Sequence, residues 1–254
     1  MIPARFASTR FPGKPLIDLQ GKPMVVRVAE RAAQSAATRV VVATDDPRIA
    51  DACTQARIAV AMTRSDHATG TDRLSEVVTQ LGLPDDAVVV NVQGDEPLMP
   101  ASVIDQVAAL LQQQARAAMA TFCHPIHDLA DAINPNVVKC ALNEAGEAMY
   151  FSRAPIPYAR DHWSAGIDAM PSSLPMFRHV GLYAYRASFL RVFPTLAIPA
   201  IERFEALEQL RALAHGYRIA VAIVDAQLPP GIDTPEDYAR LRDRYSVSGE
   251  SFFT

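Results

Sequence analysis

Three short apolar runs, which alternate with stretches of helical pattern, restrict the possible folds of this chain more than any other feature. The runs cover residues 40–43, 58–62 and 87–92 and consist mainly of valine and alanine. A helical pattern begins near residue 47, and a second one covers residues 71–81. Uninterrupted apolar strands are typical of parallel strands that are buried on both faces. The order therefore predicts an α/β fold with a parallel sheet and helices on both faces.

The second half of the chain contains shorter expected strands and a long loop. We expect strands over residues 119–123, 137–142, 148–152, 178–185 and 218–224. Helices are expected from Pro100 to about residue 114, over residues 202–215 and over residues 235–245. Four prolines between residues 154 and 177 interrupt any regular pattern and indicate a loop. The middle of the chain is therefore expected to form a smaller sub-domain.

Composition and charge exclude several classes of protein. The chain has 254 residues, is 50% hydrophobic and carries a formal net charge of −4, so nothing in its charge favours nucleic acid or an anionic membrane as a partner. No apolar run approaches the ~18 residues of a transmembrane helix, and no signal peptide is recognisable. The scattered Cys53, Cys123 and Cys140 are typical of reduced thiols. We therefore expect a cytoplasmic protein.

The first seventeen residues carry three cations, Arg5, Arg10 and Lys14, and no carboxylate. Prolines and a glycine exclude a regular helix or a central strand here. Two interpretations are open: a frayed terminus, or a loop that binds phosphate. Apolar residues between the cations favour the second, because they can pack against a core. Lys14 is followed by Pro15, so the hydroxyl residue of a P-loop is missing and side-chain cations would have to bind the phosphate.

Two acidic turns are candidate Mg²⁺ sites. Asp95 and Glu96 come shortly after the expected strand over residues 87–92, at the sheet edge where ligands bind in open α/β folds. Asp233 comes just before Thr234, which is expected to cap the last helix. Each turn also has an ordinary explanation, a tight turn for the first and a helix start for the second. Carboxylates opposite a cationic loop are suited to hold a metal that bridges to phosphate.

Two further segments could bind a ligand. Residues 67–71 place a glycine between hydroxyl side chains and could contact a base or sugar, or form a loop whose Thr71 caps the next helix. On the strand over residues 178–185, His179, Tyr183 and Tyr185 share one face. That face suits a hydroxyl-rich ligand but is also common in a core. No Ser-His-Asp or Cys-His arrangement stands out, so covalent catalysis has no support.

Seven segments distributed over the chain carry a family resemblance. They are residues 2–15 (IPARFASTRFPGKP), 43–45 (ATD), 91–97 (NVQGDEP), 150–153 (YFSR), 178–183 (RHVGLY), 208–211 (EQLR) and 231–237 (GIDTPED). Together they resemble the CMP-Kdo synthetases, the 3-deoxy-D-manno-octulosonate cytidylyltransferases. The first and third also occur in altered form in sialic-acid cytidylyltransferases, whereas residues 178–183 and 231–237 look like the Kdo branch.

The resemblance implies a fold, a reaction and partners. The fold would be a nucleotidyltransferase-like single domain with a mixed, mainly parallel sheet. Residues 1–116 and 217–245 would form its CTP-binding core, residues 117–216 a sugar-binding and dimerisation sub-domain, and residues 246–254 a tail. The reaction would be CTP plus Kdo to CMP-Kdo and pyrophosphate, for lipopolysaccharide synthesis. The protein would be a cytoplasmic homodimer that requires Mg²⁺.

The resemblance also implies roles for individual residues. Arg10 and Lys14 would hold the triphosphate with Arg5 nearby, and Asp95 and Asp233 would bind the metal. The cytidine would meet Ala4 and the 67–71 loop, which includes Thr69, Gly70 and Thr71. The sugar-acid pocket would contain Arg73, Gln93, Arg153, His179, Tyr183, Glu205 and Gln209.

Two alternatives stay open at this point. The chain could be a cytidylyltransferase for another acid sugar, such as a sialic acid or an amino-Kdo, or a nucleotide-binding protein without catalytic activity. A pure binder would have no use for two metal carboxylates and a leaving-group lysine. The resemblance also implies several apolar residues before the IPAR segment, whereas here Met1 precedes Ile2 directly. A first strand of only two or three residues is therefore expected.

Overall fold

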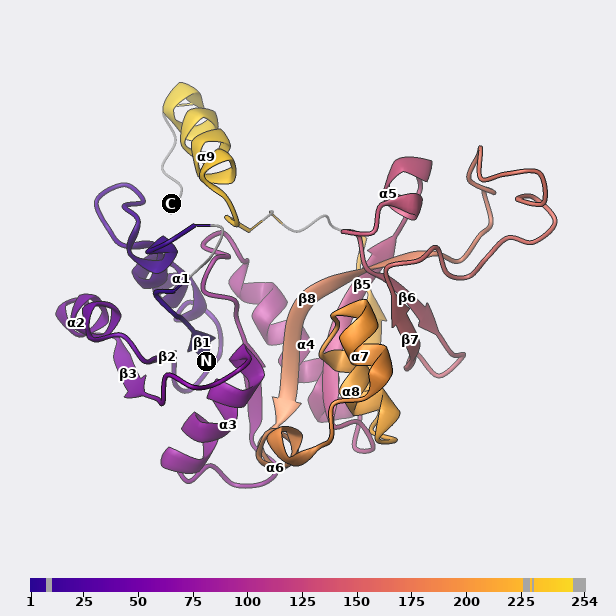
Figure 1. Cartoon of the computed structure of the whole chain (residues 1–254). Helices are drawn as coiled ribbons and strands as arrows, with labels where there is room; N and C mark the ends of the chain where they lie inside the picture. The colour runs from indigo at the N-terminus through magenta and orange to yellow at the C-terminus, as the bar shows by residue number, and fades with distance from the viewer. Residues whose placement is uncertain (8–10, 226–228, 230, 249–254) are drawn as a thin grey trace.

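The computed structural model describes residues 1–7, 11–225, 229 and 231–248, and within the last of these ranges the side chains up to residue 242. Strands from the two halves of the chain lie next to one another, with helices on both sides (Figure 1). The α/β class expected from the alternating pattern is confirmed.

The first sheet is parallel, as the sequence predicts. It has the order β1 (Ile2–Pro3), β2 (Val41–Thr44) and β3 (Ala59–Met62). Both ladders, β1 with β2 and β2 with β3, are parallel. All four residues of β2 are buried, which explains why this strand is apolar without alternation. Helices α1 (Met24–Ala32), α2 (Pro47–Gln55) and α3 (Gly70–Gln80) belong to this half.

The second sheet is mixed. Its strands are β4 (Val88–Asn91), β5 (Met119–Pro125), β6 (Lys139–Leu142), β7 (Ala148–Ser152), β8 (Phe177–Arg186) and β9 (Ile219–Ile223). The order is β7-β6-β8-β5-β9, with β4 also paired to β8. Only β5 and β9 run parallel; β8 is antiparallel to β4, β5 and β6. Apolar patterns do not encode strand direction, so the sequence could not specify this arrangement.

Backbone hydrogen bonds of Met1 connect the two sheets. Its amino nitrogen donates to Val90 O at 2.7 Å, and Val92 N donates to Met1 O at 3.0 Å. This pattern is that of a parallel pairing with β4. The short β1 therefore lies between β2 and β4 and brings the N-terminal loop to the end of β4.

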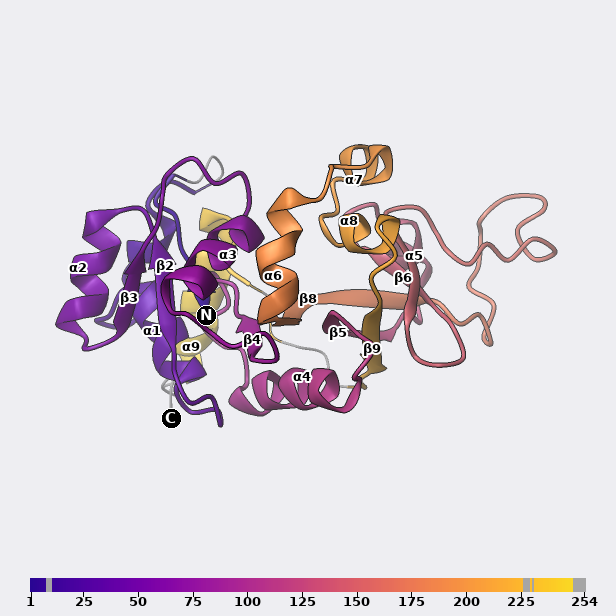
Figure 2. The same ribbon diagram turned by 90° about the horizontal axis from the view of Figure 1, so that it is seen from below.

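Helices cover both faces of the second sheet. Figure 2 shows α4 (Ala101–Gln113) on one face and α6 (Ala187–Val192), α7 (Ala200–Glu205) and α8 (Gln209–Ala214) on the other. Two further helices are α5 (Leu129–Ile133) and α9 (Pro235–Ser248). Two short 3-10 helices, η1 (Lys14–Leu16) and η2 (Phe193–Thr195), complete the set in the described ranges. The sequence patterns missed α1, α5 and α6.

Three predicted boundaries were wrong. The single helix expected over residues 202–215 is two helices, because Ala206 has a φ of 51° and ends α7. Thr69, not Thr71, caps α3: its hydroxyl accepts a hydrogen bond from Asp72 N. Helix α9 continues to Ser248, so the first residues of the expected tail are helical; residues 249–254 lie outside the described part. The capping of α9 by Thr234 is confirmed, since its hydroxyl accepts from Asp237 N at 3.2 Å.

The proline-containing segment between β7 and β8 is a long loop, as predicted, and extends away from both sheets (Figures 1 and 2). Its Trp163, which is 1% exposed, belongs to a small cluster with Ile126, Ala132 and Val137 from the segment between β5 and β6. The indole nitrogen of Trp163 donates to Ala169 O at 2.7 Å. The loop is therefore held by packing and not only by its ends.

Cys53, Cys123 and Cys140 are buried free thiols whose pKa values are raised by burial, as expected of core cysteines. None of the helices in the described residues is both long and apolar enough to cross a membrane.

Candidate functional site

Two neighbouring cavities lie where the two sheets meet. The first has a volume of about 320 Å³, and the second has a volume of about 260 Å³. They share Gly70, Gln93 and Glu208 as lining residues. Gly70 begins α3 and Gln93 follows β4, so the shared wall comes from both halves of the molecule. The two cavities therefore adjoin at these three residues.

Lys14 lies between two carboxylates at one end of the first cavity. Its Nζ is 2.5 Å from Asp95 Oδ2 and 3.2 Å from Asp233 Oδ1. Because both distances are measured to one atom, the two carboxylate oxygens are no further apart than the sum of 2.5 and 3.2 Å. Residues separated by 138 positions in sequence thus converge, as the sequence analysis expected.

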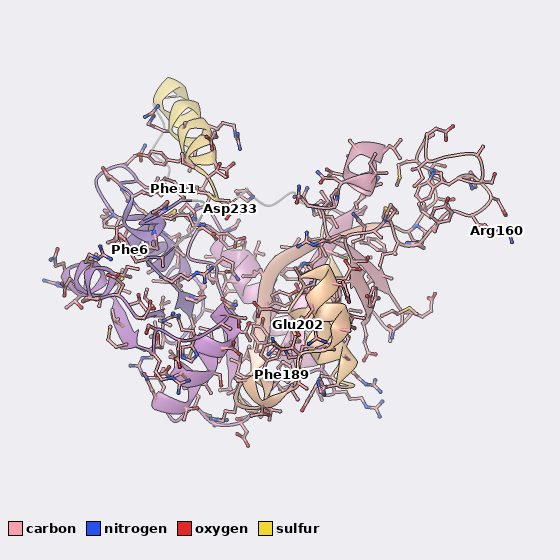
Figure 3. All side chains as sticks on the ribbon, in the orientation of Figure 1. Phe6, Phe11, Arg160, Phe189, Glu202 and Asp233 are labelled. Carbon is pink, nitrogen blue, oxygen red and sulfur yellow. The ribbon has the colours of Figure 1, made fainter. Side chains whose placement is uncertain are left out.

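Local backbone structure brings these three residues together. Gly13, with a φ of 72°, comes just before η1, which begins at Lys14. A Cβ on Gly94 would lie 2.9 Å from Pro3 O, so only glycine lets the turn before Asp95 approach β1 this closely. The Asp95 carbonyl accepts a hydrogen bond from Ile232 N at 2.8 Å. That bond ties the turn after β4 to the segment before α9, where Figure 3 shows Asp233.

A third carboxyl group, that of Glu96, lies near Asp95 and Asp233. Glu96 Oε2 is buried and has no hydrogen-bond partner among the described residues. Burial, together with the charges of Asp95 and Asp233, raises the pKa of Glu96 to about 8. Asp95 and Asp233 together oppose the single positive charge of Lys14, an arrangement that suits a divalent cation.

No group of three or more His, Cys, Asp or Glu side chains in the described ranges could hold a metal ion alone. Two carboxylates are nevertheless enough for Mg²⁺ when substrate phosphates and water supply the remaining ligands. The donor chemistry of Asp95 and Asp233 therefore fits Mg²⁺ bound together with a phosphate-bearing ligand.

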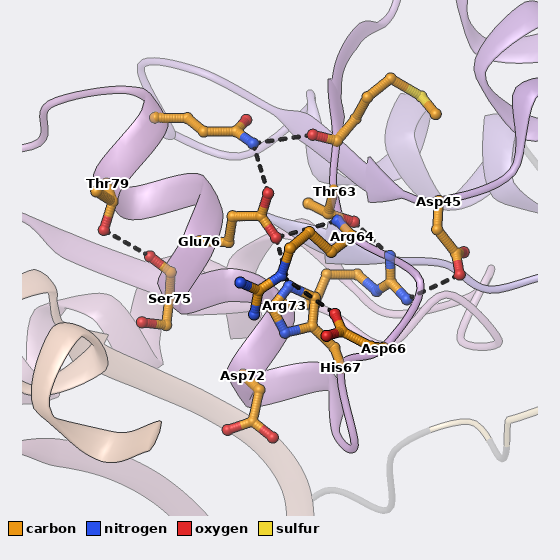
Figure 4. Close-up of polar contacts among 12 residues, drawn as sticks. Asp45, Thr63, Arg64, Asp66, His67, Asp72, Arg73, Ser75, Glu76 and Thr79 are labelled. Atoms are coloured by element: carbon orange, nitrogen blue, oxygen red, sulfur yellow. Dashed lines mark hydrogen bonds and ion pairs between the residues drawn. The ribbon is translucent and has the colours of Figure 1, made fainter. Parts of the chain in front are cut away.

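The loop before α3 forms another wall of the first cavity. Glu76 holds it in place: one carboxylate oxygen accepts from Arg64 N at 3.1 Å and contacts His67 Nε2, and the other accepts from Gln80 at 2.9 Å (Figure 4). His67, Thr69 and Gly70 line the cavity. Loop and helix are thus fixed before a ligand arrives.

Arg73, which the family resemblance assigns to the sugar-acid pocket, lines the first cavity. The residue is 4% exposed. Its guanidinium donates to the Thr63 hydroxyl and lies 3.4 Å from Asp45 Oδ2 (Figure 4). The Asp45 contact also gives a physical role to the ATD segment, which the sequence analysis could only match to a family.

Most of the other residues expected at the nucleotide line the first cavity. They are Ala4, Arg5, Thr69 and Gly70. Thr71 lines the second cavity instead. Arg10 lies outside the described residues.

The second cavity contains only part of the expected sugar-acid set. Gln93, Tyr183 and Gln209 line it. Asn91 and Glu208, which were not predicted as site residues, also line this cavity. Burial raises the pKa of Glu208, whose carboxylate faces the hydroxyls of Thr71 and Thr69. Asn91 and Glu208 both belong to segments that carry the family resemblance, which was the one signal that could have identified them.

Arg153, Glu205 and His179 are not among the described residues that line the two cavities. Glu205 accepts hydrogen bonds from Ser152 Oγ at 2.6 Å and Arg153 N at 2.8 Å, and Arg153 Nε donates to Glu205 O at 2.7 Å. These contacts tie the end of β7 to α7. His179 contacts the Thr121 hydroxyl at 3.1 Å, and burial lowers the pKa of its imidazole to about 3. All three contribute to packing in this structure.

Comparisons with known proteins identify the family of this chain. A family model described as cytidylyltransferase matches residues 1–219. A curated 3-deoxy-manno-octulosonate cytidylyltransferase from Herminiimonas arsenicoxydans is 55% identical over 242 residues, which cover 95% of this chain and 96% of the relative.

Solved structures extend the comparison. A CMP:2-keto-3-deoxy-manno-octonic acid synthetase complexed with CTP superposes with a TM-score of 0.87 at 39% identity, over 97% of each chain. A cytidylyltransferase from Leptospira borgpetersenii serovar Hardjo-bovis (strain JB197) has a TM-score of 0.62 at 17% identity, covering 99% of this chain and 88% of that one, and shows the fold alone. This chain, which carries the two cavities and the convergence at Lys14, therefore belongs to the cytidylyltransferase family.

Proposed function

We propose that this chain transfers CMP from CTP to 3-deoxy-D-manno-octulosonate (Kdo) and releases pyrophosphate. The observation that carries the proposal is the cluster of Lys14, Asp95 and Asp233 beside two joined cavities. The high identity to a Kdo cytidylyltransferase supports Kdo as the acceptor. The product would activate Kdo for lipopolysaccharide biosynthesis.

Each of the two cavities binds one substrate. CTP occupies the first, with its phosphates at Lys14 and its cytidine toward the 67–70 loop. Kdo occupies the second and meets CTP at the wall shared by Gln93 and Glu208. In this arrangement the anomeric hydroxyl of Kdo would attack the α-phosphorus from the side opposite the pyrophosphate that leaves.

Lys14 contributes charge at the reacting phosphates. Its ammonium is largely enclosed, with 13% of the side chain exposed. A fixed cation in such a site stabilises the negative charge that develops on the leaving pyrophosphate. Arg5 and Arg73, which line the same cavity, add to this positive charge.

Asp95 and Asp233 are the residues that would hold Mg²⁺. When bound, the metal would neutralise phosphate charge and lower the pKa of the attacking hydroxyl. The two carboxylates are anchored by backbone hydrogen bonds, since Asp95 O accepts from Ile232 N and Asp237 holds the Asp233 and Thr234 amides. Their positions are therefore preorganised. We further propose a cytoplasmic homodimer.

A pyrophosphate-release assay tests the proposal. With CTP and Mg²⁺ present, we expect release to be clearly faster with Kdo than with N-acetylneuraminate, and to stop when Mg²⁺ is chelated. An equal or reversed preference between the two sugars would assign the chain to the sialic-acid branch. No release with either sugar would favour a nucleotide-binding role, which CTP binding by calorimetry would then report.

A further inference from the structure

The N-terminal loop that carries Arg5 and Lys14 is closed by contacts between Phe6 and Gly13. Gly13 N donates a hydrogen bond to Phe6 O at 3.2 Å. A Cβ on Gly13 would lie 3.2 and 3.3 Å from two atoms at the far edge of the Phe6 ring, so the glycine backbone lies close to that ring. Arg5 precedes Phe6, Lys14 follows Gly13, and both cations line the first cavity. The spacing of the two cations therefore depends on the contact between Phe6 and Gly13.

Arg48, at the start of α2, covers the face of the Phe6 ring. Its guanidinium carbon lies 3.4 Å from the ring centre, and Figure 3 shows Phe6 beside this helix. A planar guanidinium at this distance stacks on the ring and is attracted to its π electrons. Phe6 also packs against the larger hydrophobic core of the protein. Arg48 thus closes the remaining side of a ring that already contacts Gly13 and the core.

The orientation of the Arg48 guanidinium is fixed by Asp46. The Asp46 carboxylate accepts from Arg48 Nε at 2.9 Å and from Arg48 Nη2 at 2.6 Å, which is a bidentate arrangement. Asp46 N in turn donates to the hydroxyl of Thr44, the last residue of β2, at 3.2 Å. Because a bidentate pair uses only the edge of the guanidinium, its flat face is free to stack on Phe6. A chain of contacts therefore joins the end of β2 to the N-terminal loop.

Helix capping alone does not explain where this guanidinium lies. Asp46 caps α2 by accepting from the backbone nitrogen of Arg48 at 2.9 Å, and that bond does not need the arginine side chain. The Arg48 side chain is 58% exposed and is not among the described residues that line the two cavities. Its contact with the loop that holds Lys14 is through Phe6. Any effect of Arg48 on a ligand at Lys14 by contact therefore passes through that ring.

We propose that Arg48 is a positioning residue for nucleotide binding: it holds Phe6 against Gly13 and thereby keeps Arg5 and Lys14 at the spacing that a triphosphate needs. Without Arg48 the ring can move away from Gly13, and part of the binding free energy of CTP is then used to order the loop. The inference rests on the proposed function, because it takes the ligand at Lys14 to be a triphosphate.

Arg48→Ala and Phe6→Leu are the first tests, with CTP binding measured by calorimetry in the presence of Mg²⁺ and without sugar. Each substitution should raise the Kd of CTP about fivefold, the effect of losing one exposed cation–π contact. The KM for CTP should rise equally, while turnover at saturating CTP and the KM for Kdo stay within about twofold, because bound CTP orders the loop. Phe6→Tyr keeps the ring and should bind CTP as the parent does.

Arg218→Ala is the matched control. Arg218 is similarly exposed, at 46%, and pairs with Glu147 in the turn before β7, away from the N-terminal loop. This variant should bind CTP as the parent does. An unchanged Kd of CTP in Arg48→Ala, or the same rise in Arg218→Ala, would overturn the proposal.

The double variant Arg48→Ala/Phe6→Leu separates a contact from a charge effect. If Arg48 acts through Phe6, the second substitution removes nothing more, and the Kd of CTP should stay about fivefold above that of the parent. If Arg48 instead attracts the triphosphate through its charge at a distance, the two effects should multiply to about 25-fold. The second result would overturn the proposal.

The same measurements distinguish this inference from the proposed function. A parent protein that binds CTP but releases no pyrophosphate with Kdo would refute the proposed function, and the variants would still decide the role of Arg48 through the Kd of CTP. A parent protein that binds no CTP would refute both.

Discussion

At the scale of single residues, the site depends on a lysine that lies between two carboxylates. Lys14 is 13% exposed, whereas Asp95 and Asp233 are 25% and 46% exposed. The lysine is thus enclosed while the carboxylates are partly open to solvent, so these ion pairs contribute less to the free energy of unfolding than fully buried pairs would. The role of the ion pairs is to hold the lysine and both carboxylates where the substrate phosphates would bind. Substitutions here should change activity much more than stability.

Lys14→Ala is expected to lower turnover by about 10²–10³, the usual loss for one preorganised charge-stabilising group. The melting temperature should change by only a few degrees. Steady-state pyrophosphate release measures the effect, and Lys22→Ala, which removes a lysine paired on the surface with Glu30, is the control. Turnover within a few-fold of the parent would contradict the role of the N-terminal loop in phosphate binding.

Asp95→Asn and Asp233→Asn should each abolish Mg²⁺-dependent turnover while the fold is retained, because an amide oxygen carries no net charge for the metal. The dependence of pyrophosphate release on Mg²⁺ concentration is the measurement. Asp85→Asn, which changes a surface carboxylate paired with Arg191, serves as the control. If either site variant kept the parent's Mg²⁺ dependence, that carboxylate would not be a ligand.

At the scale of elements, a buried ion pair joins the two short helices that form one wall of the second cavity. Arg211 donates to Glu202 with both Nε and Nη2, at 2.8 and 2.6 Å. The guanidinium also lies 4.4 Å from the centre of the Phe193 ring. The pair fixes α8 against α7 across the break at Ala206. Glu208 and Gln209, which line the cavity, lie between the two charged residues in sequence.

Glu202→Gln should destabilise the protein by about 3–5 kcal/mol, because it leaves the buried Arg211 without a countercharge. For a chain of this size that corresponds to a fall in melting temperature of roughly 10 °C. Arg160→Ala, which breaks an exposed pair with Asp161, is the comparison and should shift it by about 1–2 °C at most. Equal effects of the two substitutions would show that the buried pair has no special role.

At the scale of the whole molecule, Met1 is where the two sheets meet. Its ammonium is buried against Val90 O, and burial lowers the pKa of this group from 8.0 to about 5. Next to it lies an apolar groove of about 610 Å³ whose lining includes Val40, Val88 and Leu83. The junction of the sheets thus combines a buried amine, whose charged form the fold disfavours, with apolar surface that is only partly covered.

Stability should therefore depend on pH between 8 and 5. The fold favours the neutral amine, so this group costs nothing above pH 8, and stability falls as the pH drops toward 5, where the loss levels off at up to about 4 kcal/mol. Urea unfolding at several pH values measures this. Acetylation of Met1 removes the charge and should remove this part of the pH dependence; a dependence that survives acetylation would have to come from other groups.

Adding five or six β-branched residues before Ile2 in place of Met1 should raise the melting temperature. The added residues would continue β1 between β2 and β4, cover the groove and move the terminal charge into solvent. An extension of the same length made of glycine and serine is the control, because it moves the charge but covers little apolar surface. A β-branched extension that gives no more stability than this control would show that the groove does not accept a strand.

The local elements could be predicted largely from the sequence, because their signals are local. The apolar run at residues 40–43 became β2, and Thr234 caps α9 as its hydroxyl and the following proline indicate. The break at Ala206 was missed, since a positive φ at alanine has no signal in sequence. The contacts of Arg73 with Thr63 and Asp45 could not be predicted from the sequence, because they join separate segments.

The sequence by itself determined the alternating strands and helices, the cationic loop and the two acidic turns, since each depends on residues close together in the chain. Only the tertiary structure decided that Asp95, Asp233 and Lys14 share one site, that β8 runs antiparallel to its neighbours, and that Asn91 Oδ1 and the Tyr183 hydroxyl lie buried at one cavity with no hydrogen-bond partner among the described residues. Those relations arise from packing between distant segments, and packing depends on the whole chain being folded at once.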